Sequence, residues 1–145
     1  SLEYNVLLKH LKRWPVLPLP GGGRSLKRPI YSGDLTDPLV KMAHLEGVSG
    51  KIYALAGQET LSFREICEIS KTLANFHCIL LPIPLFLAKP AIRILQWIRR
   101  SSVSPQQALA GFIYDADLDI SLAEKDLNFK PRGFSEGIQD CLPRE

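Results

Sequence analysis

Residues 17–35 are Leu-Pro-Leu-Pro-Gly-Gly-Gly-Arg-Ser-Leu-Lys-Arg-Pro-Ile-Tyr-Ser-Gly-Asp-Leu, and this stretch decides the fold of the chain. An apolar extended segment comes first, then a triple-glycine turn, then a second extended segment that begins with two cations. Gly21, Gly22 and Gly23 tolerate backbone angles that are closed to other residues, so we expect the chain to reverse there. The reversal would place residues 17–19 beside residues 27–31.

The two cations of this stretch, Lys27 and Arg28, are the candidates for binding an anion. Neighbouring residues of a strand point to opposite faces, so at most one of the two should face any given pocket. Asp34, at the end of the stretch, is expected to cap a helix that runs to about Glu46.

The remaining pattern predicts a mixed α/β fold in one domain. Apolar spacing near three and four favours helices, and the runs Ser62–Glu65 and Ser121–Glu124 both have the sequence of a capping box. Asn128 suits a left-handed helix end. The helices are expected over residues 1–14, 34–46, 62–74, 121–127 and 134–141, and short strands over residues 16–19, 27–31, 52–55 and 78–81.

Several of these segments together resemble the extended short-chain dehydrogenases, the NAD-dependent epimerase and dehydratase family. The matching residues are Leu17-Pro18-Leu19, Gly23, Lys27 and Asp34-Leu35-Thr36, then the strand and helix of residues 51–65, and finally Asp119-x-Ser121-x-Ala123 with Asp126-Leu127-Asn128-Phe129-x-Pro131. The resemblance covers a little over half of the chain. It implies that Lys27 stands where the family has an Arg that contacts a substrate diphosphate, with Arg28 displaced by one residue.

The resemblance further implies that residues 1–145 are the C-terminal, substrate-binding domain of a larger protein with a Rossmann-type N-terminal half. That half would bind NAD or NADP, because neither its Gly-x-x-Gly-x-x-Gly turn nor its Tyr-x-x-x-Lys pair occurs here. The expected function is to bind the substrate of an NAD(P)-dependent sugar-nucleotide epimerase or dehydratase, or of a related reductase. The main chain of Leu17, Pro18 and Leu19 would face the substrate, and Lys27 or Arg28 would pair with its phosphate.

Charge and cysteine content set the wider context. The net charge is +3, and the basic residues gather in residues 1–28 and 89–100. Two sparse patches suit an anionic ligand but not a nucleic acid. The three cysteines, Cys67, Cys78 and Cys141, include no closely spaced pair, which is typical of reduced thiols in a cytoplasmic protein.

The segment Pro82 to Arg100 is apolar and basic, but prolines and charges interrupt it too often for a membrane span. A helix that packs on the body of the protein is the default expectation. A helix that rests on a membrane surface, with Lys89, Arg93, Arg99 and Arg100 at its edge, is the alternative. It supports a second hypothesis, in which the chain is a non-catalytic assembly or membrane-surface protein with the same fold.

No self-contained active site is evident in the sequence. The three histidines stand on separate predicted elements, without a carboxylate or thiol at ligand spacing. Three alternating acids at Asp115, Asp117 and Asp119 lack the Gly and Glu of a helix-flanked calcium loop. We therefore expect no catalytic, cofactor-binding or metal-binding residue in this chain. A strand cut off from the missing half would expose an edge, so we also expect self-association.

Overall fold

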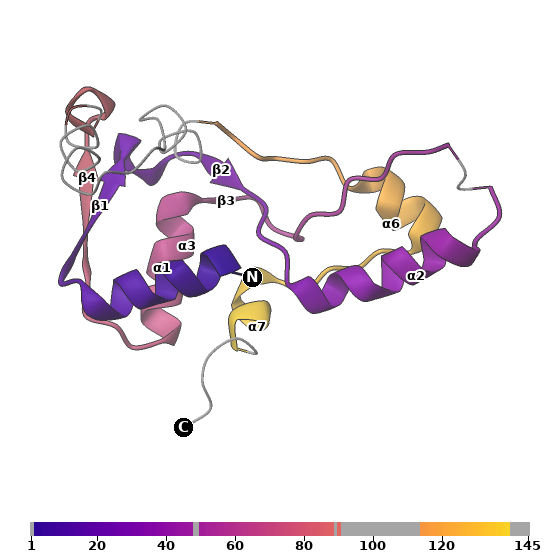
Figure 1. The fold of residues 1–145 in the computed structure, drawn as a ribbon, viewed down its shortest axis with the longest axis horizontal. Coiled ribbons are helices and arrows are strands. Elements are labelled where there is room, and N and C mark those ends of the chain that lie inside the picture. The colour runs from indigo at the N-terminus through magenta and orange to yellow at the C-terminus, as the bar shows by residue number, and fades with distance from the viewer. Residues whose placement is uncertain (1, 48–49, 89, 91–113, 140–145) are drawn as a thin grey trace, which may run out of the picture.

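Helices and short strands are interspersed along the chain in the computed structural model, which describes residues 2–47, 50–88, 90 and 114–139. The fold is mixed α/β, as the sequence predicts (Figure 1). The helices are α1 (Leu2–Arg13), α2 (Thr36–His44), α3 (Phe63–Leu73), α6 (Ser121–Leu127) and α7 (Phe134–Gln139). The strands are β1 (Val16–Pro20), β2 (Leu26–Lys27), β3 (Leu61–Ser62) and β4 (Ile79–Ile83).

The first strand pairs with the last one, and not with residues 27–31. β1 and β4 are parallel and in register from Val16 opposite Ile79 to Pro20 opposite Ile83. The chain does turn at the three glycines, whose φ values of 64°, 72° and 68° are left-handed, but the turn directs it away from β1. The expected pairing was therefore wrong. β4 supplies the matching apolar strand, and its predicted position is confirmed within two residues.

β2 is shorter than predicted and pairs antiparallel with β3, a strand that the sequence did not indicate. Pro29 has no amide hydrogen to continue the ladder. The carbonyl of Arg28 instead accepts the amide of Gly57 at 3.2 Å, which draws residue 57 against the end of β2.

Residues 51–56 were expected to form a strand, but they have no strand partner in the described part of the chain, so that prediction was wrong. The side chain of Ile52 is 91% exposed. Lys51 and Tyr53 both bind the carboxylate of Asp126 on α6, at 2.7 and 3.0 Å, and hold the segment to that helix. A β-rich sequence forms a ladder only where a second strand lies beside it.

Two of the predicted helix ends are confirmed. At the start of α3, Ser62 Oγ accepts the amide of Glu65, and the Glu65 carboxylate accepts the amide of Ser62, so the capping box is complete. At the end of α6, Asn128 has the left-handed angles φ 50° and ψ 42°.

Two predicted helix caps were wrong, although α6 begins at Ser121 as predicted. Before α2, residues Ser32–Leu35 form a 3-10 turn, and Asp34 makes no cap hydrogen bond. At α6 the capping box of Ser121 does not form, because Ser121 donates its amide and its hydroxyl to Asp119. Asp34 instead accepts from Arg132. At α6 it is Asp119, and not Ser121, that accepts an amide at the start of the helix.

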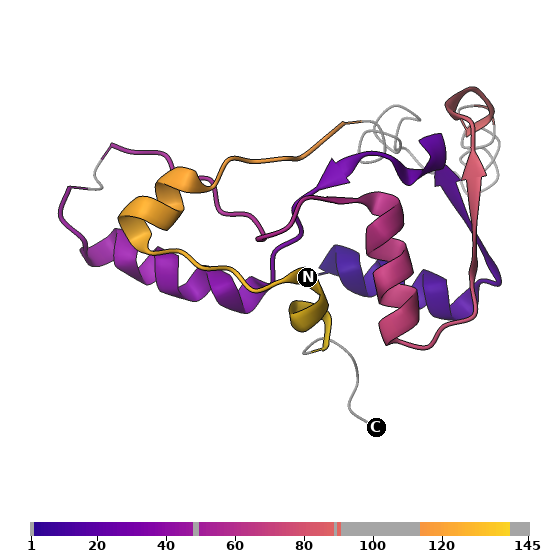
Figure 2. The same cartoon turned by 180° about the vertical axis from the view of Figure 1, so that it is seen from behind.

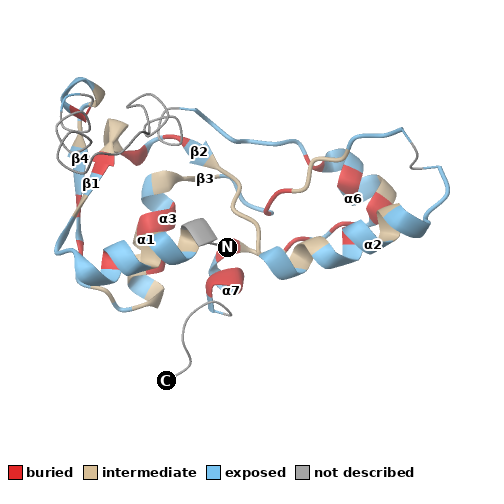
Figure 3. Ribbon diagram, viewed as in Figure 1, coloured by how far each residue is buried: buried red, intermediate tan, exposed pale blue. Residues whose placement is uncertain are grey.

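In the part of the chain that the structure describes, the core consists of three apolar clusters. The first joins α1, β1, α3 and β4 around Leu19 and Cys67, the second joins α6 to residues 53–56, and the third joins α1, α3 and α7 around Ile66 and Phe134. Figures 1 and 2 show an elongated molecule, with α2 and α6 at one end and β1 and β4 at the other. The buried positions of α1, α3 and α7 face one another, while those of α6 face α2 and residues 53–56 (Figure 3).

Among the helices of the described residues, none has the length and apolar character needed to cross a membrane. Most of the apolar segment Pro82 to Arg100 lies outside the described residues. The described part includes the end of β4 and a helical turn over residues 85–88, on which Phe86 is 73% exposed.

Candidate ligand-binding site

A cavity of about 700 Å³ lies between the part of the molecule that contains α2 and α6 and the part that contains β1 and β4. Its walls are mainly apolar and come from the second and third core clusters. The apolar side chains that line it include Tyr4, Leu7, Leu55, Phe63, Ile66, Phe134 and Ile138. The volume falls within the range of about 300 to 1,000 Å³ typical of small-molecule sites.

The aromatic rings present mostly carbon to this space. Tyr4 and Phe134 meet edge to face, with ring centroids 6.0 Å apart. The hydroxyl of Tyr4 donates to Ser70 Oγ at 3.1 Å on α3, so this polar group is bound within the protein. One wall of the cavity is therefore built to contact an apolar surface.

Three cationic side chains, Lys27, Arg28 and Arg132, are the charged groups on the described walls, and no carboxylate accompanies them there. The expectation that only one of Lys27 and Arg28 can face a given pocket was wrong. β2 ends at Lys27, so the alternation of a strand does not continue to Arg28.

Arg28 is engaged by the protein itself. Its Nε and Nη2 donate to the carbonyls of Gly57 and Gln58, each at 3.1 Å, and its Nη1 donates to the carbonyl of Leu118. The carboxylate of Asp117 lies 3.9 Å away. Arg28 thus joins three segments of chain that form the cavity, and few of its donors remain for a ligand.

Lys27 is less engaged. Its ammonium donates to the carbonyl of Tyr114, and no carboxylate in the described residues lies within ion-pair distance of it. An ammonium has three donors, so two stay available for an anion. Of the predicted site residues, Lys27 is the one whose position suits the predicted role.

Arg132 was not predicted to belong to the site. Its Nε donates to Asp34 Oδ1 at 2.8 Å, its main-chain amide donates to Asp34 Oδ2 at 2.9 Å, and its guanidinium lies 4.3 Å from the ring centre of Tyr31. These partners are about 100 residues away in sequence, so no local pattern could have indicated the contact. The pairing explains why Asp34 does not cap α2.

Leu17, Pro18 and Leu19 do not line this cavity. Leu19 is fully buried in the first core cluster, Leu17 packs against that cluster, and Pro18 lies opposite Leu81 in the ladder with β4. The structure thus brings Lys27 and Arg28 together at the cavity and leaves the three β1 residues in the core and the sheet.

The acidic run after residue 114 has structural partners. Asp115 accepts the amide of Leu26 at 2.7 Å, Asp117 accepts the hydroxyl of Thr60 at 2.9 Å, and Asp119 accepts the amide of Ser121 at 2.9 Å. Among the described residues no group of three His, Cys, Asp or Glu side chains could hold a metal ion.

Asp126 and Cys67 are among the groups outside the cavity whose pKa values are shifted. The hydrogen bond from Lys51, followed by that from Tyr53, lowers the pKa of Asp126. Burial, with smaller contributions from Cys78 and Glu68, raises the pKa of the Cys67 thiol to about 12. Cys67 and Cys78 are both buried and unpaired, which agrees with the expectation of free thiols.

No protein-family model matches the chain, and no curated protein matches it. Among solved structures the chain is similar to the crystal structure of gox2253, with a TM-score of 0.65 and 16% sequence identity. The similarity covers 97% of this chain and 42% of that one, so this chain spans less than half the length of its structural neighbour. At this identity the similarity shows the fold alone, which is a mixed α/β fold with a small parallel sheet.

Proposed function

We propose that residues 1–145 form the C-terminal, substrate-binding domain of an NAD(P)-dependent enzyme of the extended short-chain dehydrogenase family. The observation that carries the proposal is the apolar cavity with Lys27 on its wall. The sequence resemblance places an anion-binding residue at this position. The reaction would be that of an epimerase, a dehydratase or a related reductase.

The nicotinamide cofactor belongs, in this proposal, to the part of the protein that precedes these residues. A dinucleotide pyrophosphate is held by a glycine-rich turn that leads from a strand into the N-terminus of a helix. Gly21–Gly23 follow β1, but they lead to β2 and not to a helix. The described residues therefore do not fit the cofactor, and NAD or NADP would have to be bound elsewhere.

Residues 51–56 support the proposal that another part of the protein packs against this domain. They have a β-rich sequence, lack a strand partner in the described chain, and expose Ile52. We infer that this segment pairs with a sheet of the N-terminal half, and that the isolated 145-residue chain self-associates through it. Sedimentation should show a concentration-dependent dimer that Ile52→Lys weakens. A strictly monomeric chain at high concentration would contradict this inference.

The proposed function is tested by thermal-shift titration of the full-length protein with NAD, NADP and a panel of nucleotide sugars. A ligand that binds only the folded state raises the unfolding temperature by mass action. Stabilisation by a cofactor is the expected result. Lys27→Met should abolish stabilisation by any nucleotide sugar that binds and leave that by the cofactor. If neither nicotinamide cofactor stabilises the protein, the enzyme proposal fails.

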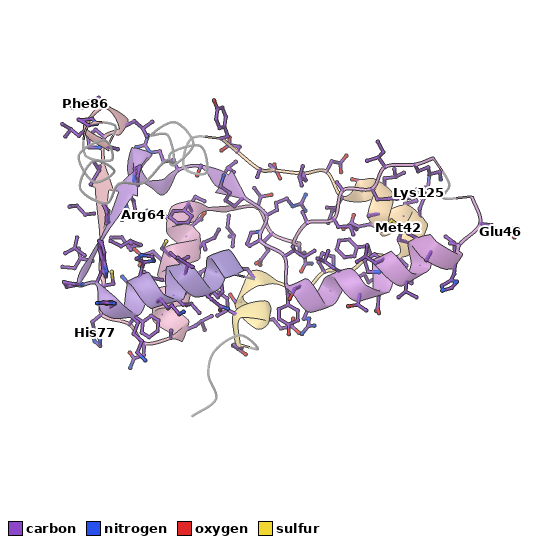
Figure 4. The ribbon with its side chains drawn as sticks, in the orientation of Figure 1. Met42, Glu46, Arg64, His77, Phe86 and Lys125 are labelled. Atoms are coloured by element: carbon purple, nitrogen blue, oxygen red, sulfur yellow. The ribbon has the colours of Figure 1, made fainter. Side chains whose placement is uncertain are left out.

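The second candidate is a non-catalytic assembly or membrane-surface protein. Its support is the exposed apolar surface of β4 and of the helical turn that follows it, where Leu81 and Phe86 are exposed. Phe86 lies at the tip of the molecule, far from His77 at the other end of the strand (Figure 4). The basic residues that would accompany it, Lys89, Arg93, Arg99 and Arg100, lie outside the described residues.

Co-sedimentation with vesicles that contain anionic lipid tests this candidate. Phe86→Glu should abolish binding, and Leu39→Glu on α2 is the matched control, since Leu39 is also exposed and apolar. Equal binding by the wild type and Phe86→Glu would argue against a membrane role. A cytoplasmic location accords with the two unpaired thiols, and fractionation of cells that express the full-length protein would test it.

A further inference from the structure

The ligand class that the cavity would accept can be inferred from the chemistry of its walls. This inference rests on the proposed function, because it names the substrate class of the same site. Three observations bear on it, namely the apolar character of the walls, the state of each polar group, and the distribution of charge.

The apolar walls indicate a ligand with a hydrophobic body. Side chains from α1, α3 and α7 face the space, among them Leu7, Ile66 and Ile138, together with the rings of Phe63 and Phe134. Contact with such walls removes apolar surface from water, at about 25 cal/mol per Å². A chain or ring system of carbon would gain this energy in full.

A nucleotide sugar suits the same walls poorly. Each of its hydroxyl groups needs a hydrogen-bond partner when buried, and an unmatched one costs about 1 to 3 kcal/mol. Arg28 is engaged by three main-chain carbonyls, and Arg132 by Asp34 and Tyr31. Tyr31 and Ser32 add two hydroxyl groups to the described walls. The walls therefore offer the several hydroxyls of a sugar few side-chain partners that are not already in use.

The charge on the walls indicates an anionic end. Asp34 compensates Arg132 at 2.8 Å, and Asp117 partly compensates Arg28 at 3.9 Å. Lys27 has a carbonyl partner but no carboxylate within reach in the described chain. The ammonium of Lys27, with hydrogen-bond donors still available, therefore lies on the β2 side of the apolar cavity.

We infer that the cavity binds an amphiphilic anion, with its hydrocarbon body against α1, α3 and α7 and its carboxylate or phosphate on Lys27. A fatty carboxylate and an alkyl or isoprenoid phosphate share this chemistry. Both have one compact anionic group at the end of an apolar body.

The test is calorimetric titration of the full-length protein with decanoate, decyl phosphate, 1-decanol and UDP-glucose, all below their aggregation limits. We expect both anions to bind, with 1-decanol at least tenfold weaker and no binding of UDP-glucose. Decanoate against decyl phosphate distinguishes the two sources of the anion. Decanoate should also bind at least tenfold more tightly than hexanoate, since each buried CH₂ contributes about 0.8 kcal/mol.

Variants locate the anion. Lys27→Met keeps the apolar stem of the side chain. It should weaken the binding of decanoate about tenfold or more and leave the binding of 1-decanol unchanged, and Lys27→Arg should restore the binding of decanoate. Lys125→Met is the matched control, because it removes one charge from an exposed lysine on α6, at the end of the molecule that holds α2 and α6 (Figure 4). Equal losses in Lys27→Met and Lys125→Met would overturn the assignment, as would equal binding of decanoate and 1-decanol.

The inference and the proposed function can fail separately. If NAD or NADP stabilises the protein but no amphiphile binds, the enzyme proposal stands and the ligand class is wrong. If decanoate binds through Lys27 but neither cofactor stabilises the protein, the ligand class stands and the dehydrogenase proposal fails. Tight binding of UDP-glucose, or a stable dimer that excludes decanoate, would overturn the inference.

Discussion

Gly57→Ala should be among the most damaging single-methyl changes in this protein. A Cβ at residue 57 would overlap the carbonyl oxygen of Pro29 and lie 2.8 Å from its carbonyl carbon. Both atoms are main chain, so no rotamer change can relieve the overlap. The two segments must separate where Gly57 donates its amide to the carbonyl of Arg28 at 3.2 Å and accepts from Arg28 Nε at 3.1 Å.

The magnitude follows from these two hydrogen bonds. A neutral main-chain bond contributes about 1 kcal/mol, and one from a charged donor about 1.5 to 3 kcal/mol. Losing both would lower the free energy of unfolding by about 2.5 to 4 kcal/mol. At roughly 3 °C per kcal/mol for a chain of this size, the unfolding temperature would fall by about 7 to 12 °C.

Gly133→Ala is the matched control for urea and thermal unfolding of the 145-residue chain. Gly133 lines the cavity, and a Cβ there would meet only the Glu59 carboxylate, at 3.8 Å or more. Its effect should be neutral, or stabilising by up to about 1 kcal/mol through the unfolded state. If the free energies of unfolding of Gly57→Ala and Gly133→Ala differ by less than about 0.5 kcal/mol, the main chain of Pro29 does not lie against Gly57 as described.

Three more outcomes follow from single contacts. Ser62→Ala should lower the free energy of unfolding by about 0.5 to 2 kcal/mol in urea titrations, whereas Ser121→Ala, whose capping box does not form, should change it by less than about 0.5 kcal/mol. Because burial raises the pKa of Cys67 to about 12, iodoacetamide at pH 8 should label this thiol only in urea; peptide mass spectrometry that finds equal labelling of the folded protein would contradict its burial. Lys51 lowers the pKa of Asp126, so this carboxylate stabilises the fold above its ordinary pKa of 3.8 and the contribution disappears as the pH falls through the lower folded value. Asp126→Asn should therefore flatten the acid side of the stability profile, measured by urea unfolding at successive pH values, and an unchanged slope would rule the contact out.

The sequence by itself determined those features that depend on neighbours within one turn of chain. Ser62 and Glu65 form their capping box because the two residues are three positions apart at one helix end, where each side chain reaches the main-chain amide of the other. Asn128 ends α6 because its own backbone tolerates left-handed angles. The apolar spacing of α1 and the left-handed glycines at residues 21–23 are of the same kind, and the structure has them where the pattern predicts.

Only the tertiary structure decided which distant segments meet. β1 pairs with β4 across about 60 residues of chain, and Asp34 pairs with Arg132 across about 100, so neither contact has a local signal. The residues of 51–56 have the composition of a strand, but a ladder needs a second strand beside them. The cavity arises for the same reason, because its walls come from segments far apart in sequence. Lys27 lies on its wall beside Tyr114 and Ala116, and Tyr114 is 87 residues away in sequence.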